Sequence, residues 1–282
     1  MGAKTAKSDP RAALSGLLER LDATGCEALE SHLLSHSNLP GPRGNLELSA
    51  ACAAAVRDRL KHDPRAAPQL WALCESWAHL EVAAAPVNDP HEFLVFCAAR
   101  AIAEFEGERR FANEVWPRLR ALASDPRWRT REGVAMALQH LLSATPAVAQ
   151  RELKRWSRAA GQWLLLRAVV AAVAEPALLA GAEQVDFAFL VHGAVLKRFV
   201  RAAERRSDEF KTLRQALGYT ISVLAAADPE RGWALLDELT ASGNADLLWI
   251  VKENLKKKRL ISTGPSRAAG LAKRIAAIRT AG

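Results

Sequence analysis

The stretch SDPRWRTREGVAMALQHLL, residues 124–142, decides the expected fold because a second stretch repeats its pattern. Residues 125–132 read D-x-x-W-x-x-R-E, and residues 246–253 read D-x-x-W-x-x-K-E. In each, an acid is followed three positions later by a tryptophan and six positions later by a cation. A recurring pattern of this kind predicts a repeated structural unit before it predicts an isolated site.

Two further stretches carry parts of the same pattern. Residues 161–179, GQWLLLRAVVAAVAEPALL, place Trp163 four positions before Arg167, and residues 211–229 repeat the arginine and the small apolar helix from Arg214. Apolar residues recur at spacings of three and four, and breaks such as KHDPRAAP, SATP and AADPERG pair a small polar residue with proline. Strand patterns are nearly absent. The sequence therefore predicts an all-α protein built from stacked helix pairs.

The residue types of each predicted unit suggest their roles. Asp125 and Asp246 are expected to accept hydrogen bonds from free N–H groups at the start of the second helix, and Asn45 is expected to cap the helix that follows it. Gly133 is expected to let neighbouring helices approach closely. Because one helix pair cannot bury its own apolar face, neighbouring pairs are expected to share a core. Three tryptophans are expected to fill that core, or alternatively to stack on a ligand: Trp128, Trp163 and Trp249.

An aspartate followed six positions later by an arginine is typical of HEAT repeats. Asp125 with Arg131 fits this spacing, as does Asp246 with Lys252, and the chain resembles the HEAT repeat family over roughly residues 50–260. The resemblance implies a right-handed α-superhelix, or solenoid, formed by residues 11–282 as a single domain. Residues 1–10 are polar and are expected to form a flexible tail, and a short basic segment is expected to cap the array at the C-terminus.

Three local motifs are similar to segments of the DNA alkylation repair family, the HEAT-like alkylpurine DNA glycosylases. They are APQLWALCESWAHLEVAAAPV (residues 67–87), DPRWRTREGVAMAL (residues 125–138) and ADLLWIVKENLKKKRL (residues 245–260). The resemblance implies that duplex DNA lies in a basic concave groove made by the second helices, and that the N-glycosidic bond of an alkylated purine is hydrolysed there. It implies a groove lined by cations at matching repeat positions: Arg131, Arg167, Arg214 and Lys252. Trp128, Trp163 and Trp249 would then stack on sugar or base.

The sequence departs from this family at the expected catalytic position. Active members carry a tryptophan and an aspartate four residues apart, upstream of the arginine helix. The corresponding residues 86–102, PVNDPHEFLVFCAARAI, contain Asp89 and Glu92 but no tryptophan. Either carboxylate is suited to stabilising an oxocarbenium-like sugar, so these two are the catalytic candidates. Their structural alternative is a capping residue followed by a first-turn acid, and the sequence leaves enzymatic activity open.

Charge is distributed unevenly along the chain. Residues 1–106 carry 10 Lys and Arg against 14 Asp and Glu, a net of −4, whereas residues 107–282 carry 29 against 17, a net of +12. Such asymmetry predicts a polyanion such as DNA as partner of the C-terminal half, with solvated surface cations as the alternative. Further candidate phosphate contacts are Arg127, Arg129, Lys197, Arg201 and Lys256. The competing function is a scaffold that docks other proteins through its oppositely charged halves.

Several other classes of function are disfavoured by missing motifs. No apolar run approaches the ~20 residues that span a bilayer, and the polar N-terminus does not look like a signal peptide, so we expect a cytoplasmic protein without membrane contact. Glycine-rich phosphate loops are absent, so no cofactor is expected. His32 and His36 lie four residues apart without an obvious third ligand, so no metal site is expected. Four cysteines are expected to be buried free thiols: Cys26, Cys52, Cys74 and Cys97.

Overall fold

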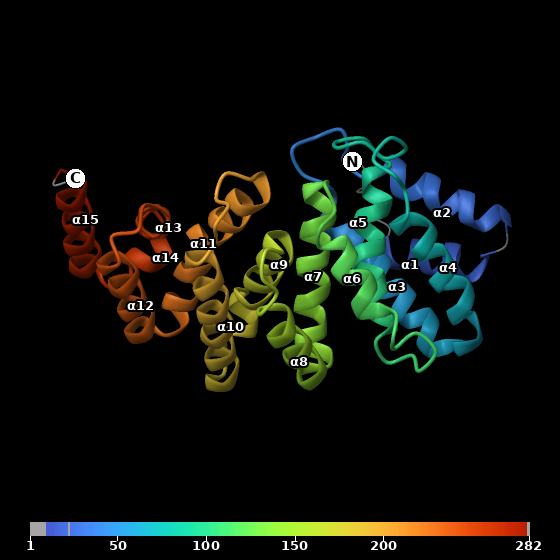
Figure 1. Ribbon diagram of the computed structural model, residues 1–282. Helices are drawn as coiled ribbons and strands as arrows, with labels where there is room; N and C mark the ends of the chain where they lie inside the picture. The colour runs from blue at the N-terminus through green and yellow to red at the C-terminus, as the bar shows by residue number, and fades with distance from the viewer. Residues whose placement is uncertain (1–9, 22, 281–282) are drawn as a thin grey trace, which may run out of the picture. The chain divides into compact units, whose positions relative to one another are not determined.

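A computed structural model describes residues 10–21 and 23–280. Every regular element within these residues is helical, with fifteen α-helices and three short 3-10 turns, so the all-α prediction is confirmed. The chain forms two compact units, residues 1–141 and 142–282, which are described separately (Figure 1). The predicted tail lies outside the described residues, apart from Pro10, which begins α1. No described helix has both the length and the apolar character that crossing a membrane requires.

The first unit is built around α3, which packs against both α1 and α5. Asn45 precedes α3 and accepts a hydrogen bond from the backbone N–H of Leu48, which confirms the predicted cap. The helices α2 and α4 also pack against α5. The helices are α1 (Pro10–Glu19), α2 (Ala23–Ser35), α3 (Leu46–His62), α4 (Ala67–Ala78), α5 (Glu92–Ala101), α6 (Val115–Leu122) and α7 (Trp128–Ala144), with 3-10 turns at Pro64–Ala66 and Ile102–Phe105.

Gly133 brings α7 into close contact with α5. A Cβ atom added at this glycine would lie 3.0 Å from both the ring and the backbone oxygen of Phe96, and 3.1 Å from the Cβ of Ala99. Any larger side chain would therefore push the helices apart. The predicted role of this glycine is confirmed, and it places the start of α7, with its arginines, directly against α5.

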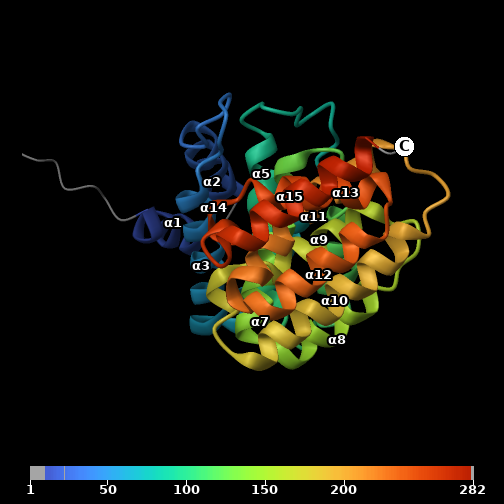
Figure 2. The ribbon, with the colours of Figure 1, turned by 90° about the vertical axis from the view of Figure 1, so that its left-hand side faces the viewer.

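The second unit is built around α11, which packs against α9 and α13 and also contacts α10 and α12 (Figures 1 and 2). Its core includes the stacked rings of Phe199 and Phe210, whose centroids are 4.4 Å apart. The side chains of Ser207, Asp228 and Asn244 cap α11, α12 and α13 in turn. The helices are α8 (Pro146–Trp156), α9 (Trp163–Val173), α10 (Ala182–Val200), α11 (Asp208–Ala227), α12 (Pro229–Ala241), α13 (Ala245–Leu255), α14 (Lys258–Ile261) and α15 (Pro265–Thr280), with a 3-10 turn at Pro176–Leu178.

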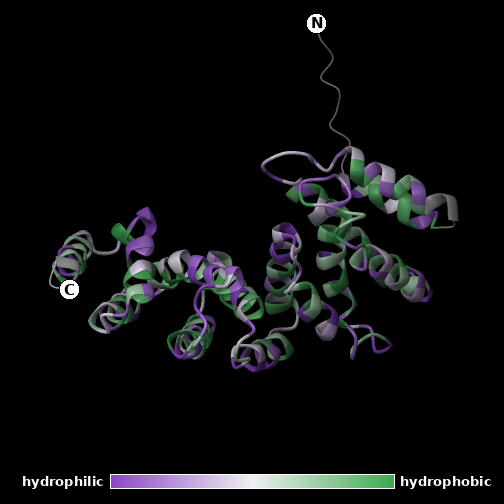
Figure 3. Ribbon diagram, turned by 45° about the horizontal axis from the view of Figure 1, so that its top comes forward, coloured by the Kyte–Doolittle hydropathy of each residue, from purple (hydrophilic) through white to green (hydrophobic). Residues whose placement is uncertain are grey.

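Hydropathy along these helices shows why they pack in this way. Figure 3 shows helices whose hydrophobic residues alternate with hydrophilic ones along the ribbon. Such helices can bury an apolar stripe only against another helix. The helix α11 departs from this pattern because it is buried on several sides: the six consecutive residues from Thr220 to Ala225, which together go around the whole helix, are all buried.

Asn254 of α13 is a fully buried polar residue that joins α13 to α11. Its side-chain oxygen accepts a hydrogen bond of 2.7 Å from the backbone N–H of Ser222. Its amide group donates to the carbonyl oxygens of Leu217 and Ile250, both at 2.8 Å. An amide buried without partners would destabilise the unit, whereas here every side-chain polar atom of Asn254 is satisfied.

His192 of α10 is also fully buried, and its ring nitrogens contact the carbonyl oxygen of Ala188 and the hydroxyl of Thr220 at 2.9 and 3.0 Å. Burial lowers the pKa of His192 from 6.5 to about 4. The unfolded chain therefore binds a proton at this residue more readily than the folded chain does. The stability contributed by neutral His192 is complete above pH 6.5 and is lost as the pH falls towards 4.

We expect acidification from pH 7 to pH 5 to lower the free energy of unfolding by about 2 kcal/mol through His192 alone. Urea unfolding followed by circular dichroism at both pH values measures this loss. In His192→Gln the loss should be smaller by that amount, because the variant has no proton to gain. The matched control is His62→Gln at the exposed end of α3. Equal pH dependence in wild type and His192→Gln would contradict the prediction.

Candidate functional site

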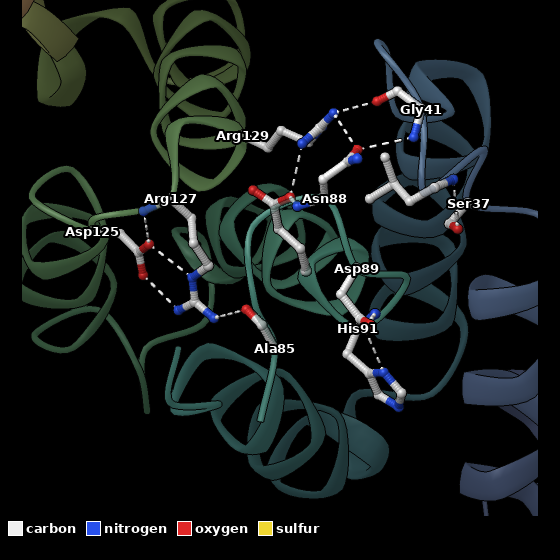
Figure 4. Close-up of polar contacts among 11 residues, drawn as sticks. Ser37, Gly41, Ala85, Asn88, Asp89, His91, Asp125, Arg127 and Arg129 are labelled. Carbon is white, nitrogen blue, oxygen red and sulfur yellow. Dashed lines mark hydrogen bonds and ion pairs between the residues drawn. The ribbon is translucent and has the colours of Figure 1, made fainter. Parts of the chain in front are cut away.

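The turn that precedes α7 is held by an ion pair between Asp125 and Arg127. Asp125 accepts from the backbone N–H of Arg127 at 2.7 Å and from its guanidinium group at 2.8 and 2.6 Å. The same guanidinium donates to the carbonyl oxygen of Leu80 at 2.8 Å. It also donates to the carbonyl oxygen of Ala85 at 3.3 Å (Figure 4). Arg127 is only 3% exposed. It therefore fastens the turn to the segment that follows α4, inside the first unit.

Arg129 forms a second buried ion pair close by, within the first turn of α7. Its guanidinium donates to the carboxylate of Glu92 at 2.9 Å, to the carbonyl oxygen of Gly41 at 2.6 Å and to the side chain of Asn88 at 3.2 Å (Figure 4). Glu92 has no exposed surface and Arg129 is 5% exposed. The ion pair thus joins α5, α7 and the loop around residue 41.

Asn88 is the centre of this network, and the sequence did not single it out. Its backbone has a φ of 69°, in the left-handed region that asparagine tolerates better than most residues. This conformation lets its N–H donate to Glu92 at 2.7 Å while its side-chain oxygen accepts from the N–H of Gly41 at 2.9 Å. The signal in the sequence was the Asn-Asp-Pro turn, residues 88–90, which is typical of a tight turn.

Trp128 lies at the start of α7 and is 43% exposed. The expectation that Trp128 fills a core between repeats is therefore wrong. The guanidinium carbon of Arg129 lies 4.5 Å from the ring centroid, so a buried ion pair holds one cation against the ring. A pocket of about 310 Å³ adjoins the ring and is also lined by Leu46, Phe96 and Met136. The exposed position leaves Trp128 accessible for the predicted stacking.

Arg131 returns to the turn from which its helix starts. Its guanidinium donates to the carbonyl oxygens of Asp125 and Pro126 at 2.6 and 2.8 Å. These carbonyls belong to the turn between two helices, so the six-residue spacing of Asp125 and Arg131 has a local structural meaning. Arg131 is partly exposed, in contrast to Arg127 and Arg129.

The two catalytic candidates lie in different environments. Asp89 accepts hydrogen bonds from the backbone N–H and the ring of His91 at 2.9 and 2.8 Å, and these bonds lower the pKa of Asp89. Its side chain is 40% exposed. Glu92 is a buried first-turn acid of α5 and is ion-paired with Arg129. Of the two, only Asp89 presents a carboxylate to solvent. Its bond to the N–H of His91 holds the turn before α5, whereas the N-cap position of α5 is His91, so the expected helix cap is wrong and the expected first-turn acid, Glu92, is confirmed.

Residues 246–253 of the second unit match residues 125–132 in sequence, but the aspartate that begins them makes different contacts. Asp246 pairs with Arg214 at 2.6 Å and with Arg205 at 3.3 Å. Asn244 caps α13 instead, through bonds from the backbone N–H groups of Asp246 and Leu247. The expectation that Asp246 caps the helix is therefore wrong. Arg214 also lies 4.7 Å from the ring centroid of Trp249.

The remaining predicted aromatic and cationic residues of the second unit are either packed or paired within the unit, or accessible to solvent. Trp163 and Trp249 pack against the core, as expected, and Trp163 meets Phe210 edge-on at 5.4 Å. Arg167 is buried and Lys256 pairs with Glu253 at 2.5 Å. Three others are accessible and have no carboxylate within ion-pair distance among the described residues: Lys197, Arg201 and Lys252.

The histidine and cysteine residues of the first unit are the candidate metal ligands of the sequence. The rings of His32 and His36 lie 4.5 Å apart, and burial together with His36 lowers the pKa of His32. No group of three or more metal-binding side chains lies together in residues 10–21 and 23–280. All four cysteines are free; three are buried as expected, whereas Cys26 is only partly buried, where burial and then Glu30 raise its pKa to about 11.

No protein-family model and no curated protein sequence matches this chain.

We expect Arg129→Met to lower the free energy of unfolding by about 3–5 kcal/mol, because it leaves the carboxylate of Glu92 buried without its cation. The double variant Arg129→Met/Glu92→Gln should lose less, because no buried charge remains. Urea unfolding of the full chain measures both. Arg109→Ala, at an exposed position of the same unit, is the control and should change stability by less than about 0.5 kcal/mol. An equal loss in the single and double variants would contradict this account of the ion pair.

Proposed function

We propose that this chain is a HEAT-like repeat protein that binds nucleic acid, most favourably duplex DNA, through cations of its second unit. The observation that carries the proposal is a group of cations from the last turn of α13 to the start of α14 whose members have no carboxylate partner within the part of the chain that the structure describes. Its members are Lys252, Lys257, Lys258 and Arg259. We call them the α13–α14 cluster.

The α13–α14 cluster differs from the other cations of its unit. Arg214, Arg231 and Arg274 each have an aspartate partner, so much of their charge is neutralised within the protein. Between residues 252 and 259 the chain carries five cations and one acid, Glu253, which is taken by Lys256. The dipole of α13 favours cations near its C-terminus and accounts for one or two of them. The others remain available to release counterions from a phosphate backbone.

The HEAT-like interpretation is supported by alternation within each unit. In the first unit α1, α3 and α5 pack successively, and in the second α9, α11 and α13 do the same, so that every second helix shares one layer. This alternation is typical of stacked helix pairs. The contact of Arg131 with the turn at Asp125 adds a local feature of the repeat pattern. A single right-handed superhelix over residues 11–282 is the arrangement that the family resemblance implies, and we propose it on that basis.

Catalysis has less support than binding. Glu92 is enclosed and ion-paired, and Asp89 is bonded to its own turn. The exposed ring of Trp128 fits a binding role, since stacking on a base needs only one free face.

We expect the wild-type chain to bind duplex DNA with a steep dependence on salt, because each phosphate that a cation neutralises releases counterions. The variant Lys257→Ala/Lys258→Ala/Arg259→Ala should lower the slope of log K against log salt concentration by roughly one for each phosphate that is no longer neutralised, up to about three. Fluorescence anisotropy with a labelled duplex across a salt series measures the slope.

The control for this experiment removes the same net charge from ion-paired surface positions of the same unit. It is Lys211→Ala/Arg267→Ala/Arg274→Ala, whose partners are Asp208, Glu230 and Asp237. Its slope should stay near that of the wild type. Absence of binding at low salt, or equal slopes for the two triple variants, would refute the proposed function.

A further inference from the structure

A groove of about 450 Å³ lies between α10 and α12 in the second unit. The two helices lie side by side on α11 (Figures 1 and 2). Leucines form much of its lining, namely Leu196 of α10, Leu235 and Leu239 of α12 and Leu247 of α13. We call it the α10–α12 groove. Its size is within the range of sites that take up a ligand or several apolar side chains.

The helix α10 presents apolar side chains to solvent on the side that its own unit leaves uncovered. Leu190 is 53% exposed and Val200 is 40% exposed, and Val200 lines the groove. Leu190, Gly193, Lys197 and Val200 recur at spacings of three and four, so they share one face of the helix. The opposite face is already buried, as Val191, Val195 and Phe199 show. Val200 is therefore the exposed apolar side chain of this face that adjoins the groove, next to Lys197 and Arg201.

Charge along the groove is asymmetric. Lys197 and Arg201 are one helical turn apart on the α10 rim, and within the described part of the chain neither has a carboxylate within ion-pair distance. Glu238 lies on the α12 rim and forms no ion pair with any described residue either. The groove therefore combines an apolar floor with one basic rim and one weakly acidic rim.

We propose that the α10–α12 groove docks an amphipathic helix of a partner protein, with acidic residues along the flank that meets Lys197 and Arg201. The apolar residues of such a helix, spaced three and four apart, would contact the exposed side chain of Val200 and the partly buried Leu235, above a floor of leucines that belong to the core of the unit. Its acids would pair with the two cations of the α10 rim and fix its orientation.

The floor distinguishes this partner from a nucleic acid. A phosphate backbone makes use of cations but gains nothing from leucines, whereas an amphipathic helix with an acidic flank makes use of both. The residues of the α13–α14 cluster, by contrast, do not line this groove. We therefore assign Lys197 and Arg201 to the groove, and the inference goes beyond the proposed function without depending on it.

The test uses the full chain and fluorescein-labelled peptides of about 18 residues, long enough for a helix to form on docking. The first peptide has leucines at helical spacing with a glutamate flank, the second has lysines in place of the glutamates, and the third is a scramble of the first. We expect the first to bind most tightly in fluorescence anisotropy. Lys197→Glu/Arg201→Glu should weaken it about tenfold or more, through the removal of attraction and the introduction of repulsion.

Two further variants separate groove docking from general charge attraction. Val200→Asp, at an exposed position, should weaken binding of the first peptide about tenfold. Lys211→Glu/Arg274→Glu makes the same charge change outside the groove and should leave binding within about twofold of wild type. Equal binding of the scrambled or the lysine peptide, or no effect of Val200→Asp, would overturn the proposal.

Two other outcomes would assign the groove to a different occupant and likewise overturn the proposal. If Lys197→Glu/Arg201→Glu weakens duplex DNA binding as much as removal of the α13–α14 cations does, the rim contacts nucleic acid. If sedimentation shows self-association that Val200→Asp abolishes, a second copy of this chain fills the groove. Failure of DNA binding with retained binding of the first peptide would refute only the proposed function.

Discussion

The packing of α11 is the constraint on which the second unit depends. This helix contacts α9, α10, α12 and α13, so its buried face extends around most of its circumference. Close approach is possible because small residues stand at the crossings. A Cβ added to Gly218 would lie 3.1 Å from Glu253 and 3.2 Å from Trp249, and one added to Gly232 would lie only 2.2 Å from the Cβ of Ala225. With α11 fixed in this way, α10 and α12 lie beside each other with a groove between them.

In the first unit, buried arginines hold the start of α7 in place. There, Arg127 and Arg129 fasten the start of α7 to loops that lie far away in the sequence, and each donates to backbone carbonyl oxygens as well as to a carboxylate. Taking two charges out of water is costly, and a single ion pair seldom offsets the cost. The added bonds to loop carbonyls give partners to the terminal nitrogens of both guanidinium groups, while Nε of Arg129 and Oε1 of Glu92 are buried without a hydrogen bond. These arginines therefore order loops, and the exposed ring of Trp128 is positioned as a result.

Local features of this structure were predictable from the sequence, whereas contacts between distant segments were not. Apolar spacing predicted the helices, Asn45 predicted a cap, and Gly133 predicted a close approach, because each depends on residues within a few positions or on size alone. The pairing of Arg129 with Glu92 joins residues 37 positions apart, and no spacing rule indicates it. Trp128 was placed in the core because its position matches that of Trp249, yet only Trp249 has a helix packed over it at Gly218. Asp246 and Asn244 are both good capping residues; Asn244 caps α13, and the carboxylate of Asp246 is ion-paired with two arginines instead.

The buried amide of Asn254 has a consequence for how the second unit moves. The N–H of Ser222 and the carbonyl of Leu217 belong to the backbone of α11, but both are bonded to a side chain of α13. Opening α11 locally at this point would also break bonds held by α13. Amide hydrogens of the two helices are therefore expected to exchange with solvent in one cooperative event rather than separately. Through a single asparagine, two helices separated in sequence form one unit of local unfolding.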